Sequence, residues 1–400
     1  MGDEEGAIKI IDVDLSSTSQ AENSGVWWRA HNNGVFDIKW CDNDTRLLSA
    51  SADQTLRIHD VSQDSSKLLA VLGGHTSTIK STVFLDPSRS GNSSDFSNSN
   101  IIASGGRDGN INIYDLRCHG AFSQLNDPST SLDTTVRRSA RARNARDAAS
   151  NQVINPVMTL RQPHNVPTGR RSTTETRSVS RTITSLVALQ SMPGILASGG
   201  SFDGIVKLWD IRCPDPSSGS RPKATPYGVL PDPTILGNPS RRSRSVNALC
   251  ESPITGDLYA LCGDSQIHVL RPSAAKADSD PLEAILPKKF VHPDLLTRSF
   301  YIRMSLSADG KYLACGSSHA GVMVWDTGSG NTTVTGSRLP FPKQHSSSQE
   351  PEAIAVDWGR DILAASSDDC TTRLWRSNSE IAAALTSTHR GTESGWSGIV

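Results

Sequence analysis

Residues 196–210 read LASGGSFDGIVKLWD, and this stretch decides the fold of the chain. Small residues come first, an Asp precedes a tight turn, and apolar and polar residues then alternate up to an aromatic residue and an acid. Residues 47–60 (LLSASADQTLRIHD) and 102–115 (IASGGRDGNINIYD) repeat this order. Alternation with a period of two is typical of half-buried strands. Each copy therefore predicts two strands joined by a turn.

Weaker copies of the pattern end at residues 12, 270, 326 and 375, so it occurs seven times in all. Another apolar strand precedes most copies, as at residues 35–40, 183–189, 301–306 and 353–358, and a shorter one precedes that, as at 68–72. Four short strands in about 40–45 residues are typical of WD repeats. A lone four-stranded sheet cannot bury both of its faces, so such units stack into a ring. We predict an all-β protein in which residues 1–400 form a single seven-bladed WD-repeat β-propeller.

Several positions depart from the repeat. The first copy lacks its two inner strands, so we expect a first blade that is incomplete at the N-terminus. His59 and Leu270 stand where Trp is usual, and His319 stands where an Asp is expected, so we expect those blades to be less rigid. The tail at residues 377–400 could supply a closing outer strand.

Two insertions at residues 119–154 and 165–181 are rich in Ser, Thr and Arg, and we expect both to be disordered. They flank a short expected outer strand at residues 156–161. The densest basic run is RRSARARNAR at residues 137–146, and RRSR follows at 241–244. Such runs act as nuclear import signals, as phosphate-binding arms or as solvated loops, and these alternatives stay open. An import signal would depend on Arg137, Arg138, Arg141 and Arg143 and would place the protein in the nucleus.

Composition and charge exclude several classes of protein. The 40 basic and 41 acidic residues give a net charge of −1, which does not favour direct nucleic-acid binding. No apolar run approaches the roughly 18–20 residues that span a bilayer. The acidic start MGDEEG is not typical of a secretory signal. The seven cysteines form no Cys-x-x-Cys pair, so we expect neither a zinc site nor a disulfide framework, and a reducing compartment.

The sequence contains no phosphate-binding loop, no His-Glu-x-x-His and no Gly-x-Ser-x-Gly motif. We therefore expect no enzyme, no cofactor and no metal site. The recurring polar residues could carry metal or acid–base chemistry, but the repeat favours a structural role. A loop His can donate to the turn Asp, and a strand Ser and the aromatic residue can extend the chain of hydrogen bonds. An unpaired buried polar group costs ~1–3 kcal/mol, which favours complete networks. Two networks are predicted: His75, Ser104, Asp108 and Tyr114, and His164, Ser198, Asp203 and Trp209.

Two copies end with an Arg two residues after the final acid, as Asp115 with Arg117 and Asp210 with Arg212. The blade does not require this Arg, whose planar fork can pair bidentately with a partner. Residues 102–117 and 197–212 resemble the Asp-x-Arg box of substrate receptors of cullin-four RING ubiquitin ligases. Those receptors dock on the damaged-DNA-binding adaptor of the ligase. The resemblance implies that these four residues bind the adaptor.

The wider chain is similar to the denticleless-type receptors of that class, on residues 50–55, 105–111, 202–210, 299–307 and 395–396. The resemblance implies a non-catalytic receptor that presents replication and cell-cycle proteins bound to the sliding clamp for ubiquitination. It also implies an acidic patch for a basic degron, for which the candidates are Glu4, Glu5, Asp53, Asp264, Asp368 and Asp369. The alternative is a WD-repeat scaffold in a chromatin or RNA-processing complex without a ligase.

Overall fold

The computed structural model describes residues 1–11, 25–41, 44–63, 65–85, 100–118, 153–165, 181–212, 226–235, 242–275, 281–319, 321–341, 351–359, 362–376 and 397–399. The chain divides into two compact units, which we describe separately. Unit 1 comprises Met1–Asp86, Gly91–Gly106 and Asn110–Leu160. Unit 2 comprises Pro87–Ser90, Arg107–Gly109 and Arg161–Val400.

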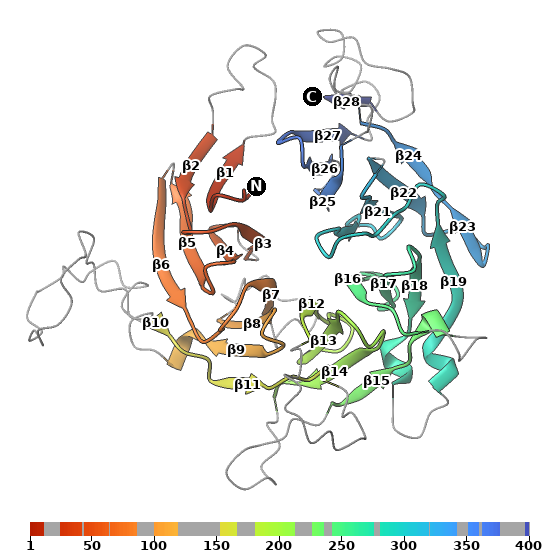
Figure 1. Ribbon diagram of the computed structural model, residues 1–400, viewed down its shortest axis with the longest axis horizontal. Coiled ribbons are helices and arrows are strands. Elements are labelled where there is room, and N and C mark those ends of the chain that lie inside the picture. The colour runs from red at the N-terminus through yellow and green to blue at the C-terminus, as the bar shows by residue number, and fades with distance from the viewer. Residues whose placement is uncertain are drawn as a thin grey trace, which may run out of the picture. The chain divides into compact units, whose positions relative to one another are not determined.

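Unit 1 contains three sheets of β-strands (Figure 1). The first pairs β1 (Ala7–Ile11) with β2 (Gly25–Arg29). The second contains, in spatial order, β3 (Val35–Trp40), β4 (Arg46–Ser51), β5 (Leu56–Gln63) and β6 (Ser65–Leu72), with β10 (Val153–Ile154) added in parallel at the outer edge. The third contains β7 (Ile79–Leu85), β8 (Ile101–Gly106), β9 (Ile111–Asp115) and β11 (Met158–Leu160).

Unit 2 contains four sheets. They are β12 (Ile183–Ala188), β13 (Ile195–Gly200), β14 (Val206–Asp210) and β15 (Gly228–Leu230); β16 (Val246–Glu251), β17 (Leu258–Cys262), β18 (Ile267–Leu270), β19 (Ile285–Val291) and β23 (Thr333–Thr335); β20 (Met304–Leu306), β21 (Tyr312–Gly316), β22 (Val322–Asp326) and β24 (Ser337–Leu339); and β25 (Ala353–Trp358), β26 (Ile362–Ser367), β27 (Thr372–Arg376) and β28 (Ser397–Ile399). The described helices are the 3-10 turns η1 (Leu116–Cys118), η2 (Pro233–Ile235), η3 (Pro272–Ala274) and η4 (Pro281–Ala284). None of these could cross a membrane.

The repeating pattern does produce strand pairs joined by a turn, and the prediction of an all-β protein built from four-stranded units is confirmed for most of the described residues. The strands predicted to end at residues 60, 115, 210, 270, 326 and 375 are each third in their sheet, although β5 continues to Gln63 and β27 to Arg376. Among the described residues, six sheets have four or five strands and the sheet of β1 and β2 has two. These sheets do not by themselves establish a closed ring of seven blades.

Three expected boundaries were wrong. Val153 and Ile154, assigned to a disordered insertion, pair with Val71 and Leu72, because Ile154 is apolar and buries its side chain there. Asn165 is likewise held in a turn by the carbonyl of Gln162. The inner strand expected at residues 301–306 begins only at Met304. The rest of the two insertions, residues 119–152 and 166–180, and most of the tail, residues 377–396, lie outside the described residues.

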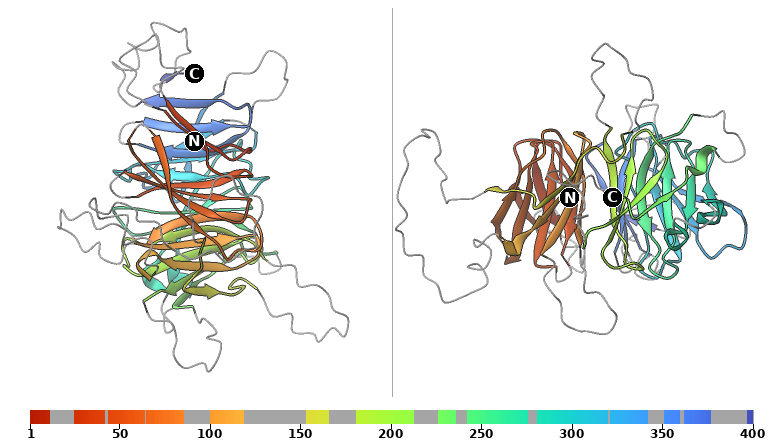
Figure 2. Two further views of the ribbon diagram at one scale, coloured as in Figure 1. Left: turned by 90° about the vertical axis from the view of Figure 1, so that its left-hand side faces the viewer. Right: turned by 90° about the horizontal axis from the view of Figure 1, so that it is seen from below.

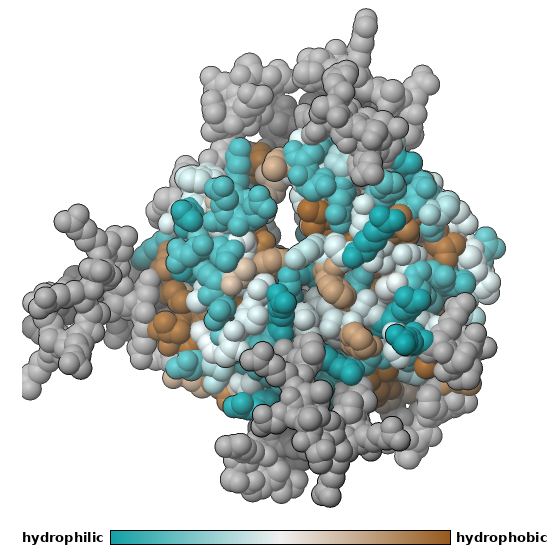
Figure 3. Space-filling view, viewed as in Figure 1, coloured by the Kyte–Doolittle hydropathy of each residue, from teal (hydrophilic) through white to brown (hydrophobic). Residues whose placement is uncertain are grey.

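The hydrophobic core lies between neighbouring sheets rather than within one large cluster. In unit 1, Leu48 and Ile58 of one sheet pack with Ile102 and Tyr114 of the next. In unit 2, three such clusters join the four sheets in chain order. On the face drawn in Figure 3, hydrophilic residues predominate and hydrophobic ones occur in small groups. Burial of both faces of each sheet thus depends on its neighbours.

Each of the six larger sheets has two ends. The turn between the second and third strands, which carries an Asp in most copies, lies at one end, here called the turn end. The third strand finishes at the opposite end, here called the loop end. In Figure 2 the strands of unit 2 run between these two ends. Antiparallel pairing also puts the connection between the first and second strands at the loop end.

At the turn end of the last sheet, a buried ion pair joins Asp369 and Arg373, with Nη2 of Arg373 2.8 Å from Oδ2 of Asp369. The guanidinium also lies over the ring of Phe341, 4.1 Å from its centroid. Burial raises the pKa of Asp369, but hydrogen bonds from Arg373 and Thr371 outweigh burial and lower that pKa to about 2. The pair therefore stays charged inside the protein.

We predict that Asp369→Asn destabilises the fold by about 3–5 kcal/mol, because it leaves the buried charge of Arg373 without a counter-charge. The measurement is the urea concentration at half-unfolding. The double variant Asp369→Leu/Arg373→Met should lose less stability than the single one, and Asp326→Asn, at an exposed position, should lose little. A single variant as stable as the wild type would contradict the prediction.

His59 of β5, which stands where Trp is usual, is buried against Trp28, with ring centroids 5.4 Å apart. Its Nδ1 has no hydrogen-bond partner among the described residues. Burial, followed by the charges of His31 and Arg57, lowers the pKa of His59 from 6.5 to about 4. His59 and its contact with Trp28 therefore occupy the place of the usual Trp of the repeat. The lower rigidity expected of this blade stays a prediction.

Because the unfolded chain takes up a proton at His59 near its ordinary pKa and the folded protein only near pH 4, acid favours unfolding between these values. The contribution of neutral His59 to the free energy of unfolding is fully present above pH 6.5. Below that pH, this contribution falls by at most about 1.4 kcal/mol per pH unit. His59→Phe should therefore lose less thermal stability between neutral pH and about pH 4.5 than the wild type. The exposed His319→Gln is the control, and an equal loss in all three proteins would disprove the assignment.

Candidate partner-binding site

Asp115 and Arg117 form a closed fork at the loop end of their sheet. β9 ends at Asp115 and η1 begins at once, which brings the side chain of Arg117 back to that of Asp115. Nε of Arg117 donates to Oδ1 of Asp115 at 2.9 Å, and Nη2 donates to Oδ2 at 2.8 Å. The backbone N–H of Arg117 also donates to Oδ1. The hydrogen bond from Arg117 lowers the pKa of Asp115, and the same bond raises the pKa of Arg117.

Asp210 and Arg212 repeat this geometry at the loop end of their own sheet. Nε of Arg212 donates to Oδ1 of Asp210 at 3.0 Å, Nη2 donates to Oδ2 at 2.9 Å, and the backbone N–H donates to Oδ1. The hydrogen bond from Arg212 likewise lowers the pKa of Asp210. The side chains of Arg117 and Arg212 are 62% and 56% exposed. Each arginine is therefore held in one orientation and still faces solvent.

Gly194 makes room for the stem of Arg212. A Cβ at this position would lie 2.5 Å from Cδ of Arg212, and the φ angle of +82° is itself one that favours glycine. The carbonyl of Gly194 accepts a hydrogen bond from the backbone N–H of Ile211 at 3.1 Å. Sequence reasoning missed this residue, although Pro193-Gly194 between two strands is a turn signal.

The predicted network around His164 is assembled in the turn end of unit 2. Nδ1 of His164 lies 2.7 Å from Oδ2 of Asp203, and Nε2 lies 2.9 Å from Oγ of Ser198. Nε1 of Trp209 donates to the same Oγ at 2.9 Å. His164 and Ser198 are almost completely buried. The four side chains are thus joined in one chain of hydrogen bonds.

The other predicted network differs in its contacts. The structure brings His75 and Ser104 together, with Nε2 to Oγ at 2.7 Å. The hydroxyl of Tyr114 donates to the carbonyl of Gly73 at 2.8 Å, because a phenol reaches further than an indole N–H. Asp108 is buried in its turn.

A third network, which was not predicted, lies around His31. Its Nδ1 is 3.0 Å from Oδ2 of Asp53 and its Nε2 is 2.8 Å from Oγ of Ser49. Burial raises the pKa of Asp53, but the hydrogen bonds from His31 and Thr55 outweigh it and hold that pKa well below its usual range. The position of His31 shortly before the first complete copy is the feature of the sequence that could have predicted this network.

Most of the acids expected to form a degron-binding patch have structural partners. Asp53 pairs with His31 of the loop before its sheet, and Asp264 and Asp369 pair with His268 and Arg373 of the strands that follow them. Asp368 is exposed, and its Oδ1 accepts the backbone N–H of Glu352. Glu4 and Glu5 are exposed in unit 1. The basic residues Arg137, Arg138, Arg141 and Arg143 lie outside the described residues.

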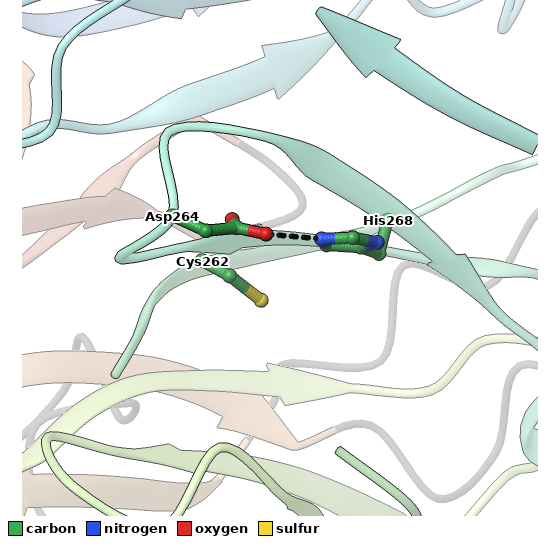
Figure 4. A group of neighbouring side chains, drawn as sticks. All are labelled: Cys262, Asp264 and His268. Atoms are coloured by element: carbon green, nitrogen blue, oxygen red, sulfur yellow. Dashed lines mark hydrogen bonds and ion pairs between the residues drawn. The ribbon is translucent and has the colours of Figure 1, made fainter. Parts of the chain in front are cut away.

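Cys262, Asp264 and His268 form a group of possible metal ligands, with ligand atoms within 4.8 Å of one another (Figure 4). Oδ2 of Asp264 is 2.9 Å from Nε2 of His268, and Oδ1 accepts the backbone N–H of Gln266. Complete burial, followed by the charges of Asp264 and Asp232, raises the pKa of the Cys262 thiol well above its ordinary value. Since metal binding needs the thiolate, the contacts are better explained as those of a turn-stabilising His–Asp pair.

We predict that Ser198→Ala destabilises unit 2 by about 1–3 kcal/mol, because His164 and Trp209 both lose their buried partner. Urea unfolding followed by Trp fluorescence measures this loss. Ser337→Ala, on the exposed side of β24, is the matched control and should change little. Equal midpoints for both variants would show that the network contributes no stability.

Known proteins resemble this chain in sequence along most of its length. The family model of the WD domain, G-beta repeat, matches residues 24–60, 66–115 and 174–210. The denticleless protein homolog of Gallus gallus is 26% identical over 94% of this chain, and the protein lethal(2)denticleless of Drosophila melanogaster is 28% identical over 94%. The cell division cycle protein cdt2 of Schizosaccharomyces pombe is 27% identical over 95%.

The chain spans 45% of the chicken relative, 42% of the fruit-fly relative and 66% of the fission-yeast relative. None of these three names indicates a catalytic activity. The resemblance to denticleless-type WD-repeat proteins is therefore confirmed: the chain contains WD repeats, its described residues form β-sheets, and it is similar to the denticleless proteins over nearly its whole length.

Proposed function

We propose that the chain is a non-catalytic substrate receptor of a cullin-four ubiquitin ligase and docks on the damaged-DNA-binding adaptor through its two Asp–Arg forks. The observation that carries this proposal is the repetition of one geometry. Arg117 and Arg212 each follow the third strand of a sheet and each make the same three hydrogen bonds to an Asp two residues earlier. The similarity to denticleless proteins supports it.

The proposal includes a closed ring of seven blades, of which the sheet of β1 and β2 is the smallest. In such a ring the sheets that hold β9 and β14 are consecutive blades, because they are consecutive along the chain. Equal positions in repeated units then put Arg117 and Arg212 on the same rim. One partner surface could contact both arginines.

The forks suit a partner-binding role energetically. A guanidinium that is already oriented loses less side-chain freedom when it binds, so more of its interaction energy appears as affinity. Truncation of an Arg anchor that becomes fully desolvated often costs ~2 kcal/mol or more. A surface ion pair that serves only the protein itself contributes about 0–1 kcal/mol. An Arg that binds the partner and an Arg that pairs only with its own Asp therefore predict different losses of affinity when the Arg is changed to Ala.

The loop end of unit 2 offers further surface beside Arg212. The carboxylate of Glu251 accepts the backbone N–H groups of Gln190 and Ser191, which ties two neighbouring sheets together at this end. Ile254 is 70% exposed and lies against the turn at Gly310. Beyond them Tyr312 stacks on Trp358, with ring centroids 6.2 Å apart. Exposed apolar side chains at the same end of the unit as an oriented Arg favour a protein-binding surface.

The remaining parts of the proposal come from the resemblance. We infer that the receptor presents proteins bound to the sliding clamp, acts in the nucleus and contacts cullin-four through the adaptor. The competing function is a WD-repeat scaffold in a chromatin or RNA-processing complex, and adaptor binding separates the two.

We predict that Arg117→Ala and Arg212→Ala each weaken adaptor binding and that the double variant weakens it at least about thirtyfold, as expected for the loss of about 2 kcal/mol or more. Co-elution and titration with purified adaptor measure this effect. Arg298→Ala, at the turn end, should bind as the wild type does. Thermal melting must show that the double variant is folded. Unchanged binding by a folded double variant would leave the scaffold function.

A further inference from the structure

A hollow of about 200 Å³ opens at the turn end of unit 2. Four loops that are distant in sequence line it: Ser201 and Phe202 after β13, Ser243–Ser245 before β16, Gly263 after β17, and Thr297–Phe300 before β20. This volume is below the about 300–1,000 Å³ of whole small-molecule sites, so it suits one side chain of a larger ligand. The hollow lies at the end of the sheets opposite to Arg212.

Two arginines give the hollow a positive charge. Arg244 and Arg298 both line it and are exposed, and neither has an ion-pair partner among the described residues. Arg181 lies beside them, with its guanidinium 5.1 Å from the ring centroid of Phe202. The hydroxyls of Ser201, Ser243 and Ser245 add donors, while that of Ser299 is directed to Glu352.

The walls of the hollow are held in place before any ligand binds. The backbone N–H of Arg298 donates to Oγ of Ser318, and that of Thr297 donates to Oγ of Ser265. The N–H of Gly263 donates to the carbonyl of Ser245 at 2.8 Å, which joins two of the four loops. Two exposed rings, Phe202 and Phe300, stand at the rim. The loops that carry Arg298 and Ser245 are therefore held in place before a ligand binds.

Asn247 supplies a second and independent indication of a ligand. It lines the hollow and is 1% exposed, and its Oδ1 has no hydrogen-bond partner among the described residues. A buried acceptor without a donor is costly, so such an atom calls for an N–H or O–H group from elsewhere. Peptide backbones carry N–H donors, whereas the sugar–phosphate backbone within a DNA strand carries neither N–H nor O–H donors.

We propose that this hollow binds a phosphorylated serine or threonine within a peptide segment of a partner protein. A phosphate group has three acceptor oxygens and close to two negative charges, which match two unpaired guanidinium groups and adjacent hydroxyls. Phe202 and Phe300 would flank the apolar neighbours of the phosphorylated residue. The acceptor of Asn247 favours a peptide backbone over that of DNA. This site goes beyond the proposed adaptor docking and does not depend on it.

The test uses the full chain and a fluorescein-labelled pool of nonapeptides with a fixed central phosphoserine, with a matched pool that has unmodified serine. Fluorescence anisotropy should show about tenfold or tighter binding of the phosphorylated pool. The variant Arg244→Ala/Arg298→Ala should bind both pools equally. Arg242→Ala, an exposed residue of the same loop that does not line the hollow, should keep the preference, and so should Arg117→Ala/Arg212→Ala.

Equal binding of the two pools by the wild type would overturn the proposal. The same holds if the folded double variant keeps the preference, since the arginines are exposed and their loss should not affect folding. Competition by oligothymidylate as strong as that by the phosphorylated pool would instead show a nucleic-acid site. Because the variants at one site serve as controls in the assay of the other, failure of either proposal can be recognised without the other.

Discussion

Where a repeat carries an Asp in its turn, that carboxylate is the constraint on which the surrounding contacts depend. An Asp between the second and third strands can accept the N–H groups that close the turn, as Asp53 and Asp369 do for Thr55 and Thr371. Its second oxygen is then buried and requires a cation or an N–H donor. The way that each repeat supplies this partner determines which loops come together.

The chain uses two solutions. In the repeats of Asp53 and Asp203, the partner is a His from the loop before the inner strand, so the carboxylate connects loops 22 and 39 residues apart. In the repeats of Asp264 and Asp369, the partner stands four residues later on the third strand, as His268 and Arg373. The second solution leaves the preceding loop unattached to the Asp. In the repeat of Asp264, the loop before β16 instead contacts the turn through the backbone, where the N–H of Gly263 donates to the carbonyl of Ser245, and this loop lines the hollow.

Much of the fold followed from the sequence because strand alternation and turn residues are local signals. The third strands and the His164 network were predictable, since every member recurs at a fixed place in the repeat. The Arg373–Asp369 pair was not, because Arg at that position is also typical of an exposed strand residue. Gly194 and the hollow around Asn247 depend on side chains brought together from separate loops. The pairing of Val153–Ile154 with β6 was missed for a similar reason: two apolar residues are too short a signal beside a long polar insertion.

The two ends of unit 2 use arginine in physically different ways. At the loop end, Arg212 is compensated by Asp210, so the pair has no net charge, and its value to a partner lies in orientation and short-range hydrogen bonds. At the turn end, Arg244 and Arg298 have no carboxylate partner among the described residues, so their charge extends into solvent and attracts anions over roughly a Debye length. Binding at the loop end should therefore depend little on ionic strength and strongly on shape, while binding at the turn end should weaken as salt rises. The sheets separate the two ends. One chain can therefore hold a contact without net charge at the loop end and a charged contact at the turn end, and neither alters the other.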